Sequence, residues 1–187
     1  GLIDIEDLKN KIRKDTILVT INSVNSEIGI KQNIEQIGRL LKEHNCYFHV
    51  DATQSIGKIN IDFKDVDLIS FSAHKFYGLK GIGCLIKKEN IELSPLINGG
   101  KSTTIYRSGT PALPLIVSMS KALRLIMNSL NQNYEYVKLL NEYIRSNLDN
   151  VIINSNEFSI PYILNISIPN IKPETILHAL EEDDIYI

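Results

Sequence analysis

Two short apolar runs, each ending abruptly in polar residues, constrain the fold of this chain most. The runs are 47–50 (Tyr-Phe-His-Val) and 68–71 (Leu-Ile-Ser-Phe). Runs of this length that are rich in aromatic and β-branched residues are typical of buried strands. The polar residues that follow them are Asp51, Gln54, Ser72, His74 and Lys75. Because ligands of open α/β sheets bind beyond the carboxyl ends of the strands, we predict that these side chains converge.

The neighbouring segments predict alternating strands and helices. Residues 16–24 are rich in β-branched residues and indicate a strand. Residues 34–43 carry apolar side chains at helical spacing, with Asn33 as the expected cap. A helix that connects two such strands makes a right-handed crossover, which joins parallel strands. We therefore predict an α/β fold with a mostly parallel sheet and helices on both faces.

The second half of the chain predicts a change of architecture. Further helices are expected at 5–12, 113–130, 134–148 and 173–181, and further strands at 84–86, 151–153 and 163–168. The polar run 128–133 is a candidate boundary. Two strands and a helix after a long helix suggest a small α+β domain. We predict one domain over 1–131 and the start of a second over 132–187.

Composition excludes several functional classes. The 187 residues are 43% apolar and 22% charged with a net charge of −2, and the basic residues are scattered, so no nucleic-acid partner is expected. No apolar run approaches the roughly 18 residues that cross a bilayer, and residues 1–4 show no signal-peptide pattern, so we expect no membrane partner and a cytoplasmic location. Cys46 and Cys84 lack the spacing of a disulfide framework or zinc site, and we expect both in the core and no metal.

The lysine and aspartate at the predicted strand ends indicate a particular cofactor. A lysine nucleophile must lose a proton that the free amine holds to pH about 10.4, and a buried aspartate needs a charged or hydrogen-bonding partner. Pyridoxal phosphate meets both needs: its aldehyde forms a Schiff base with lysine, and its protonated ring nitrogen pairs with a carboxylate. We therefore expect Asp51 on the ring nitrogen. Gln54 can donate to the phenolic oxygen, and Ser72 and His74 can bind the phosphate.

Four motifs extend this pattern along the chain. They are 49–55 (His-Val-Asp-Ala-Thr-Gln-Ser), 72–78 (Ser-Ala-His-Lys followed by Phe-Tyr-Gly), 80–83 (Lys-Gly-Ile-Gly) and 107–110 (Arg-Ser-Gly-Thr). Together they resemble the cysteine desulfurases, pyridoxal-phosphate enzymes of the class V aminotransferase group, from residue 1 to about 187. The resemblance implies part of the type I fold of pyridoxal-phosphate-dependent transferases. Residues 1–131 would be the carboxyl-terminal part of the large cofactor-binding domain.

The resemblance also implies a role for individual residues. Lys75 would be the Schiff-base lysine and catalytic residue, with Asp51 on the pyridine nitrogen and Gln54 on the phenolic oxygen. Ser72 and His74 would bind the phosphate.

Two further segments are assigned by the same resemblance. Thr110 would reach the phosphate of the neighbouring subunit's cofactor, which implies a homodimer. The loop at Asn25 and Ser26 would lie against the cofactor and the substrate carboxylate, although the family usually has a second asparagine where this chain has Ser26. Asn, Ser and Gly are also ordinary turn residues, so a purely structural turn is the alternative.

The resemblance implies an enzyme that removes sulfur from L-cysteine, leaving alanine and a persulfide whose sulfur passes to an acceptor protein, as in iron–sulfur cluster assembly. It places a second phosphate loop and a ring-stacking histidine before this chain, and the nucleophilic cysteine and a substrate-binding arginine after it. We therefore expect a fragment that is inactive alone. The alternatives are a selenocysteine lyase or other class V relative, and a non-catalytic sulfur-transfer scaffold. Unpaired buried charges would cost a scaffold several kcal/mol.

One glycine-rich segment suggests a different ligand. Residues 99–102 (Gly-Gly-Lys-Ser) superficially match the end of a nucleoside-triphosphate loop, but the upstream glycine at the required spacing is absent. The segment also departs from the family pattern after the glycine pair, so we assign it no role.

Overall fold

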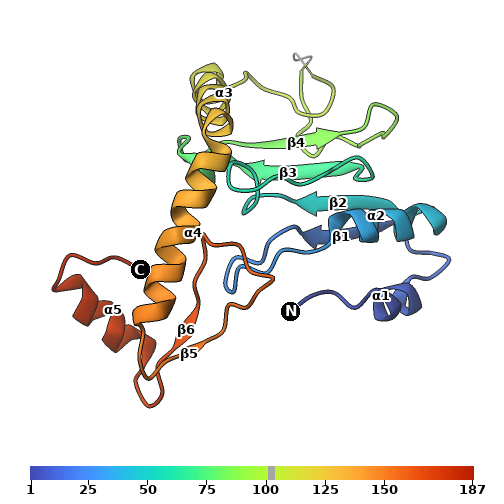
Figure 1. The fold of residues 1–187 in the computed structure, drawn as a ribbon. Coiled ribbons are helices and arrows are strands. Elements are labelled where there is room, and N and C mark those ends of the chain that lie inside the picture. Colours follow the sequence, from blue (N-terminus) through green and yellow to red (C-terminus); the bar gives the residue numbers. More distant parts are fainter. Residues whose placement is uncertain (101–103) are drawn as a thin grey trace.

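A four-stranded sheet forms the first part of the computed structural model, which describes residues 1–100 and 104–187 (Figure 1). The strands lie in the order β1 (Leu18–Asn22), β2 (Tyr47–Asp51), β3 (Leu68–Ser72) and β4 (Gly83–Lys87). The pairings of β1 with β2 and of β2 with β3 are parallel, whereas β4 runs antiparallel to β3. The predicted α/β fold with a mostly parallel sheet is confirmed. The connection from β3 to β4 is too short for the helical crossover that parallel strands require.

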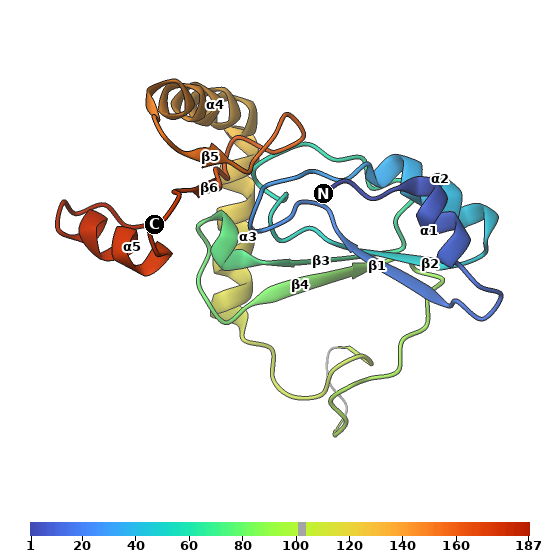
Figure 2. The ribbon, with the colours of Figure 1, turned by 90° about the horizontal axis from the view of Figure 1, so that it is seen from below.

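Helices α1 (Ile5–Lys11) and α2 (Ile34–Glu43) lie on one face of this sheet, as Figure 2 shows. Asn33 caps α2 as predicted, because its Oδ1 accepts a hydrogen bond of 3.1 Å from the backbone N–H of Gln36. The apolar stripe of α2 packs on the strands and forms the main core, which includes Ile34, Ile37, Leu41, Phe48, Val50 and Val66.

No helix of the described residues covers the opposite face of the strands, so the prediction of helices on both faces is not met within this chain. Three of its apolar side chains are substantially exposed: Leu18 at 48%, Tyr47 at 46% and Leu85 at 54%. In Figure 2 this face looks toward the long loop between β4 and the next helix. Since side chains alternate along a strand, Asp51 lies on the same open face as Tyr47.

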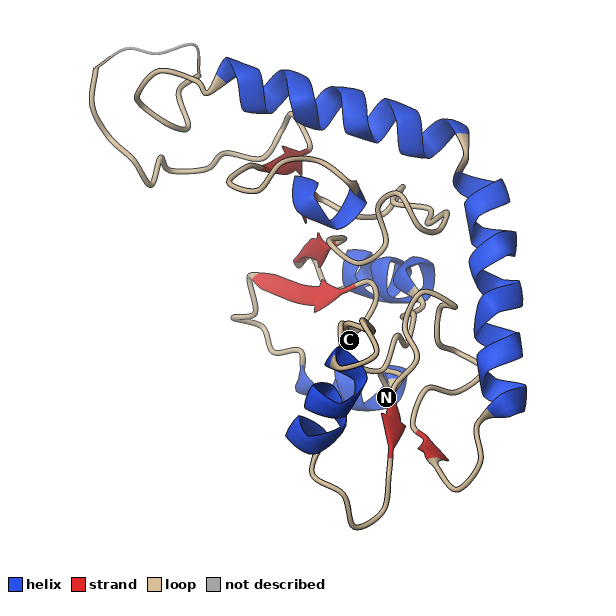
Figure 3. Ribbon diagram, turned by 90° about the vertical axis from the view of Figure 1, so that its left-hand side faces the viewer, coloured by secondary structure: helices blue, strands red, loops and turns tan. Residues whose placement is uncertain are grey.

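Two long helices follow the sheet and meet at a sharp bend. The axes of α3 (Leu113–Asn128) and α4 (Leu130–Asn147) differ by 70°, and Figure 3 shows this elbow. α3 packs against η1 (Ala73–Phe76), the short 3₁₀ helix after β3, in a second apolar cluster that contains Phe71, Phe76 and Ile126. Within the described residues no single helix has the length and apolarity to cross a membrane. Only the bent pair α3 and α4 meets those criteria jointly.

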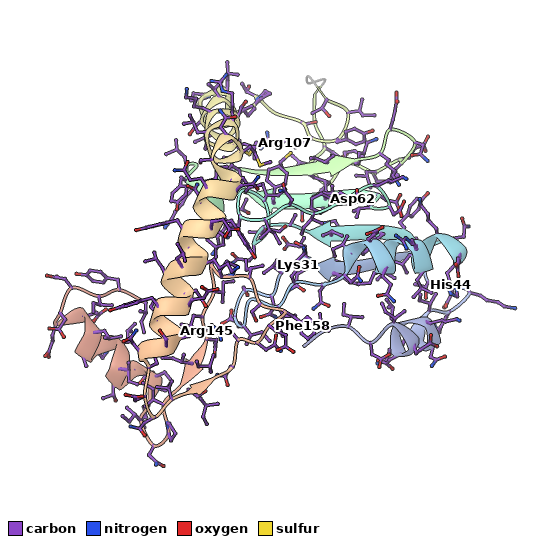
Figure 4. The ribbon with its side chains drawn as sticks, viewed as in Figure 1. Lys31, His44, Asp62, Arg107, Arg145 and Phe158 are labelled. Carbon is purple, nitrogen blue, oxygen red and sulfur yellow. The ribbon has the colours of Figure 1, made fainter. Side chains whose placement is uncertain are left out.

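The rest of the chain contains the small strands β5 (Ile152–Ile153) and β6 (Ile166–Ser167), which pair antiparallel, and α5 (Pro173–Glu181). The loop between β5 and β6 returns to the first part of the chain, where the backbone N–H of Lys31 donates to the carbonyl of Phe158 over 2.9 Å (Figure 4). The domain boundary after residue 131 stays a prediction, and the helical bend lies close to it. The glycine-rich segment 99–102 falls partly outside the described residues.

Candidate cofactor site

The predicted site residues lie where two neighbouring parallel strands end. Asp51 is the last residue of β2, and the backbone N–H of Ala52 donates to the carbonyl of Ser70 in β3 over 2.8 Å. Ser72 ends β3 and immediately precedes η1, which contains His74 and Lys75. The structure therefore brings the acid, the hydroxyl, the imidazole and the lysine to one edge of the sheet.

Asp51 is held by its own loop. Its Oδ1 accepts a hydrogen bond of 2.9 Å from the backbone N–H of Thr53, and the side chain is half-buried. This bond fixes the carboxylate on the open face of the sheet, where a positively charged group can approach it.

His49 lies two residues before Asp51 on the same face. Its Nε2 is 3.0 Å from the hydroxyl of Ser70. Burial lowers the pKa of His49, and the negative charge of Asp51 opposes this shift only in part. The ring is therefore a neutral neighbour of the carboxylate at physiological pH, bound to a hydroxyl.

Gln54 is held by a lysine that our sequence analysis missed. The Nζ of Lys58 donates to Oε1 of Gln54 over 2.8 Å. Burial, and secondarily the charge of Lys75, lower the pKa of Lys58 to about 8. No periodicity in the sequence indicates this contact, because residues 53–58 form turns rather than a helix.

Lys75 and His74 have exposed side chains. Lys75 also lines a cavity of about 240 Å³ together with Lys58, Tyr77 and Tyr162. The predicted catalytic lysine and the unforeseen Lys58 therefore border the same space.

A buried serine pair, also missed from the sequence, joins the loops behind the site. The hydroxyls of Ser23 and Ser55 are 2.7 Å apart, and Ser55 also donates to the carbonyl of Ala52 over 3.1 Å. The two serines are 32 residues apart in the chain, so no local pattern indicates their contact.

For Asn25, Ser26 and Thr110, the structure shows no contact with the other predicted site residues among the interactions of the described residues. Oδ1 of Asn25 accepts hydrogen bonds of 2.9 Å from the backbone N–H groups of Glu27 and Ile28, and Ser26 donates to the Glu27 carboxylate over 3.0 Å. These bonds are those of a turn, the structural alternative. Thr110 is exposed in the loop before α3, so its contact with a second subunit stays a prediction.

Both cysteines have the environment of packing residues. Cys46 is buried, and its Sγ donates to the carbonyl of Thr16 over 3.3 Å. Cys84 is half-buried beside the cluster that joins η1 and α3, and burial raises the pKa of its thiol. A raised pKa disfavours the reactive thiolate.

Curated relatives share much of this sequence. The chain is 40% identical to a mitosomal cysteine desulfurase of Encephalitozoon cuniculi, over 97% of the chain and 44% of the relative. It is 43% identical to the cysteine desulfurase IscS of Buchnera aphidicola, over 97% of the chain and 47% of the relative. A mitochondrial cysteine desulfurase of Arabidopsis thaliana is 43% identical over 97% of the chain and 42% of its own length. The chain thus spans about half the length of the curated relatives it matches.

Solved structures share the fold. A NifS-like protein superposes with a TM-score of 0.95 at 35% identity, over 99% of this chain and 53% of that one. The structure described as SspA in complex with cysteine superposes with a TM-score of 0.76 at 33% identity, over 100% of this chain and 52% of that one. The expected partial fold of type I is confirmed by these neighbours.

The predicted cytoplasmic location is contradicted by the relatives. The proteins of Encephalitozoon cuniculi and Arabidopsis thaliana are named mitosomal and mitochondrial. Our prediction was wrong because it was based on the lack of a secretory signal pattern and of a membrane-crossing apolar run, neither of which distinguishes the cytoplasm from an organelle.

A family model decides the broader assignment. The model described as aminotransferase class-V matches residues 1–187, which is the full length of this chain. The chain therefore belongs to the class-V aminotransferase family.

Proposed function

We propose that this chain forms the central part of the cofactor site of a pyridoxal-phosphate-dependent cysteine desulfurase. The observation that carries the proposal is the placement of Asp51 and Lys75 at the carboxyl ends of adjacent parallel strands. The Ala52 to Ser70 hydrogen bond of 2.8 Å fixes those two ends against each other. Few cofactors need both a carboxylate and a lysine amine, and pyridoxal phosphate is one of them.

The donor set fits this cofactor. When bound, pyridoxal phosphate supplies an aldehyde that reacts with an amine and a ring that withdraws electrons. Asp51, anchored by Thr53, offers a carboxylate to the ring nitrogen. The hydroxyl of Ser72 makes no capping bond to η1, so it is available to a phosphate oxygen together with His74.

In this proposal Lys75 is the residue that reacts, and the residues around it orient the cofactor. Gln54 presents a fixed amide to the phenolic oxygen, since Lys58 holds its Oε1. Lys75 provides the amine that bonds the cofactor and afterwards moves protons at the substrate carbon. The neutral ring of His49 lies beside Asp51 without competing for its charge.

L-cysteine is the proposed substrate. The relatives named above are cysteine desulfurases, and one structural neighbour was solved with cysteine bound. A homodimer with Thr110 at the partner's cofactor and a sulfur-acceptor protein complete the proposal. The exposure of Thr110 is compatible with such a contact.

The attacking thiol is not one of this chain's two cysteines in our proposal. Desulfuration needs a mobile thiolate, whereas Cys46 is buried and Cys84 is packed with a raised pKa. We therefore expect the 187-residue chain to release no sulfide from L-cysteine by itself. Sulfide release that is lost in Cys84→Ala would contradict this assignment.

The assignment of Lys75 is tested by absorbance. Adding pyridoxal phosphate to the purified protein should produce the visible band of a lysine-bound cofactor, and Lys75→Ala should abolish it. Lys80→Ala, which removes an exposed lysine nearby, is the matched control and should keep the band. An unchanged spectrum in Lys75→Ala would remove Lys75 from the site.

A further inference from the structure

Lys58 and Gln54 are brought together by tight turns that follow directly after Asp51. The backbone N–H of Ile56 donates to the carbonyl of Ala52 over 2.9 Å, and that of Ile59 donates to the carbonyl of Ser55 over 3.0 Å. Gly57, with a φ of +77°, lies between Gln54 and Lys58, so this segment is not a regular helix. Within it the Nζ of Lys58 donates to Oε1 of Gln54 over 2.8 Å.

The packing of Gly57 places Lys58 against η1. Gly57 has a φ of +77°, and a Cβ there would lie 2.9 Å from the Cβ of Phe76 and 3.0 Å from Ile126. This close approach brings the next residue, Lys58, into the space beside Lys75, where the two line a common cavity of about 240 Å³.

The position of Lys58 is costly for a charged side chain. Removal from water disfavours an ammonium group, and a second ammonium nearby adds repulsion, which together lower the pKa of Lys58 to about 8. A lysine with a purely structural role has no need of this position, since an apolar residue would fill it without the desolvation cost.

The chemistry of the bond determines which way the Gln54 amide faces. An ammonium group has three donors and no acceptor, so it can bind only the oxygen of the amide. The NH₂ group of Gln54 is then directed to the other side as a donor. The phenolic oxygen of pyridoxal phosphate is an acceptor, so the flipped amide would present an oxygen to an oxygen and lose the bond.

We propose that Lys58 is a positioning residue of the cofactor site, which holds the Gln54 amide by its oxygen so that the NH₂ group donates to the phenolic oxygen of pyridoxal phosphate. This inference rests on the proposed function, and it adds a residue that acts through Gln54 rather than on the cofactor directly. The positive charge of Lys58 also lies beside Lys75 and repels a second ammonium there.

The first test compares cofactor binding among variants of Lys58. Lys58→Met keeps the length of the side chain but has no donor. It should weaken pyridoxal phosphate binding about five- to tenfold, the usual effect of losing one ordinary hydrogen bond, here the one from the Gln54 amide, and shift the visible absorption maximum. Lys58→Arg, which keeps a charged donor, should retain the wild-type maximum. Lys14→Met, at an exposed position, is the control and should bind as wild type does.

A double-mutant cycle then separates positioning from a general effect on folding. In a Gln54→Ala background, Lys58→Met should change the affinity less than about twofold, because the amide through which it acts is gone. The same loss of affinity in both backgrounds, or a Lys58→Met protein with the wild-type maximum and affinity, would overturn the inference. The proposed function fails separately, when the wild-type protein forms no visible band with pyridoxal phosphate.

Discussion

At the residue scale, a buried contact between two serine hydroxyl groups holds the ends of β1 and β2 together. Ser23 and Ser55 are both almost completely buried, and their hydroxyls are 2.7 Å apart. The Oγ of Ser23 also lies 3.1 Å from the carbonyl oxygen of Asp51. Because each hydroxyl is removed from water, its partners must come from the protein. The pair therefore fixes the loop that starts at Asp51 against the end of β1.

Removing one hydroxyl of this pair should destabilise the fold. We expect Ser55→Ala to lower the free energy of unfolding by about 1–3 kcal/mol, since Ser23 is left with an unmet buried hydrogen-bonding site. Urea denaturation measures the change. Ser120→Ala, at an exposed position in α3, is the control and should stay within about 0.5 kcal/mol of wild type. Equal effects of the two substitutions would show that the buried contact contributes nothing.

The lowered pKa of His49 predicts how stability depends on pH. The unfolded histidine titrates near the ordinary pKa of about 6.5, whereas burial lowers the pKa of the folded ring and keeps it neutral to lower pH. Below about pH 6.5 the unfolded chain therefore binds more protons. The stability contributed by His49 is present above that pH and is lost as the pH falls through the folded pKa.

A substitution isolates this contribution. The melting temperature of His49→Gln should fall less than that of wild type between pH 7 and pH 5, because the titrating ring is absent. Glutamine keeps a polar partner for Ser70. His44→Gln, at an exposed position, should follow the wild-type curve. A His49→Gln curve parallel to wild type would remove the histidine from the acid response.

At the scale of elements, the sequence predicts best where hydrophobic periodicity and capping agree. The bounds of α2 and α5 match their predictions, and Asn33 caps α2 as expected. The start of α4 is earlier than predicted, at Leu130, because the polar residues 131–133 continue the helix that was expected to begin at 134. A run of polar residues is a weak predictor of a loop, because tertiary contacts can override the low helix propensity of such residues.

Side-chain partners within the site were harder to predict than the elements. The positions of Asp51 and Lys75 could be predicted because an apolar run followed by polar residues is a local pattern in the sequence. The bond between Lys58 and Gln54 depends on a turn whose geometry is set by Gly57 packing on Phe76 and Ile126, which come from η1 and α3. Contacts between elements that are distant in the chain leave no periodicity to detect.

The close packing of Gly57 in that turn predicts that adding one methyl group there destabilises the fold. Gly57→Ala should lower the free energy of unfolding by about 1–3 kcal/mol, because φ is +77° and the new Cβ meets Phe76 at 2.9 Å. Chemical denaturation measures the loss. Gly100→Ala is the matched control, since a Cβ at Gly100 meets no atom of the described residues within 4 Å, and it should be neutral. A stable Gly57→Ala protein would show that the turn can move away from η1.

At the scale of the whole molecule, hydrogen bonds join the loop between β5 and β6 to the loop that follows β1. We call these bonds, between residues 28–31 and 158–160, the clamp. The N–H of Ile160 donates to the carbonyl of Gly29 over 2.8 Å, and the hydroxyl of Ser159 donates to the carbonyl of Ile28 over 2.7 Å. These partners are more than a hundred residues apart, as the 131-residue separation of Ser159 and Ile28 shows. The position of the Asn25 loop is therefore set by the last third of the chain.

Loosening this clamp should release the loop without unfolding the sheet. Gly29 has a φ of +77°, and a Cβ there would lie 3.0 Å from the Cβ of Ile163. We expect Gly29→Ala to speed amide hydrogen exchange about tenfold at Lys31 and Ile160, whose N–H groups donate across the clamp, for a local cost of about 1.4 kcal/mol. The amide of Ala52, which bonds within the sheet, should exchange as in wild type.

Gly100→Ala again serves as the control for this experiment, because its Cβ would meet no atom in the described part of the chain within 4 Å. All three amides should keep their wild-type rates. Equal acceleration at Lys31, Ile160 and Ala52 in Gly29→Ala would mean that the two parts open as one cooperative unit. Unchanged rates at Lys31 and Ile160 would mean that the clamp tolerates the methyl group. Only acceleration confined to Lys31 and Ile160 supports a loop after β1 whose position is controlled from the second half of the chain.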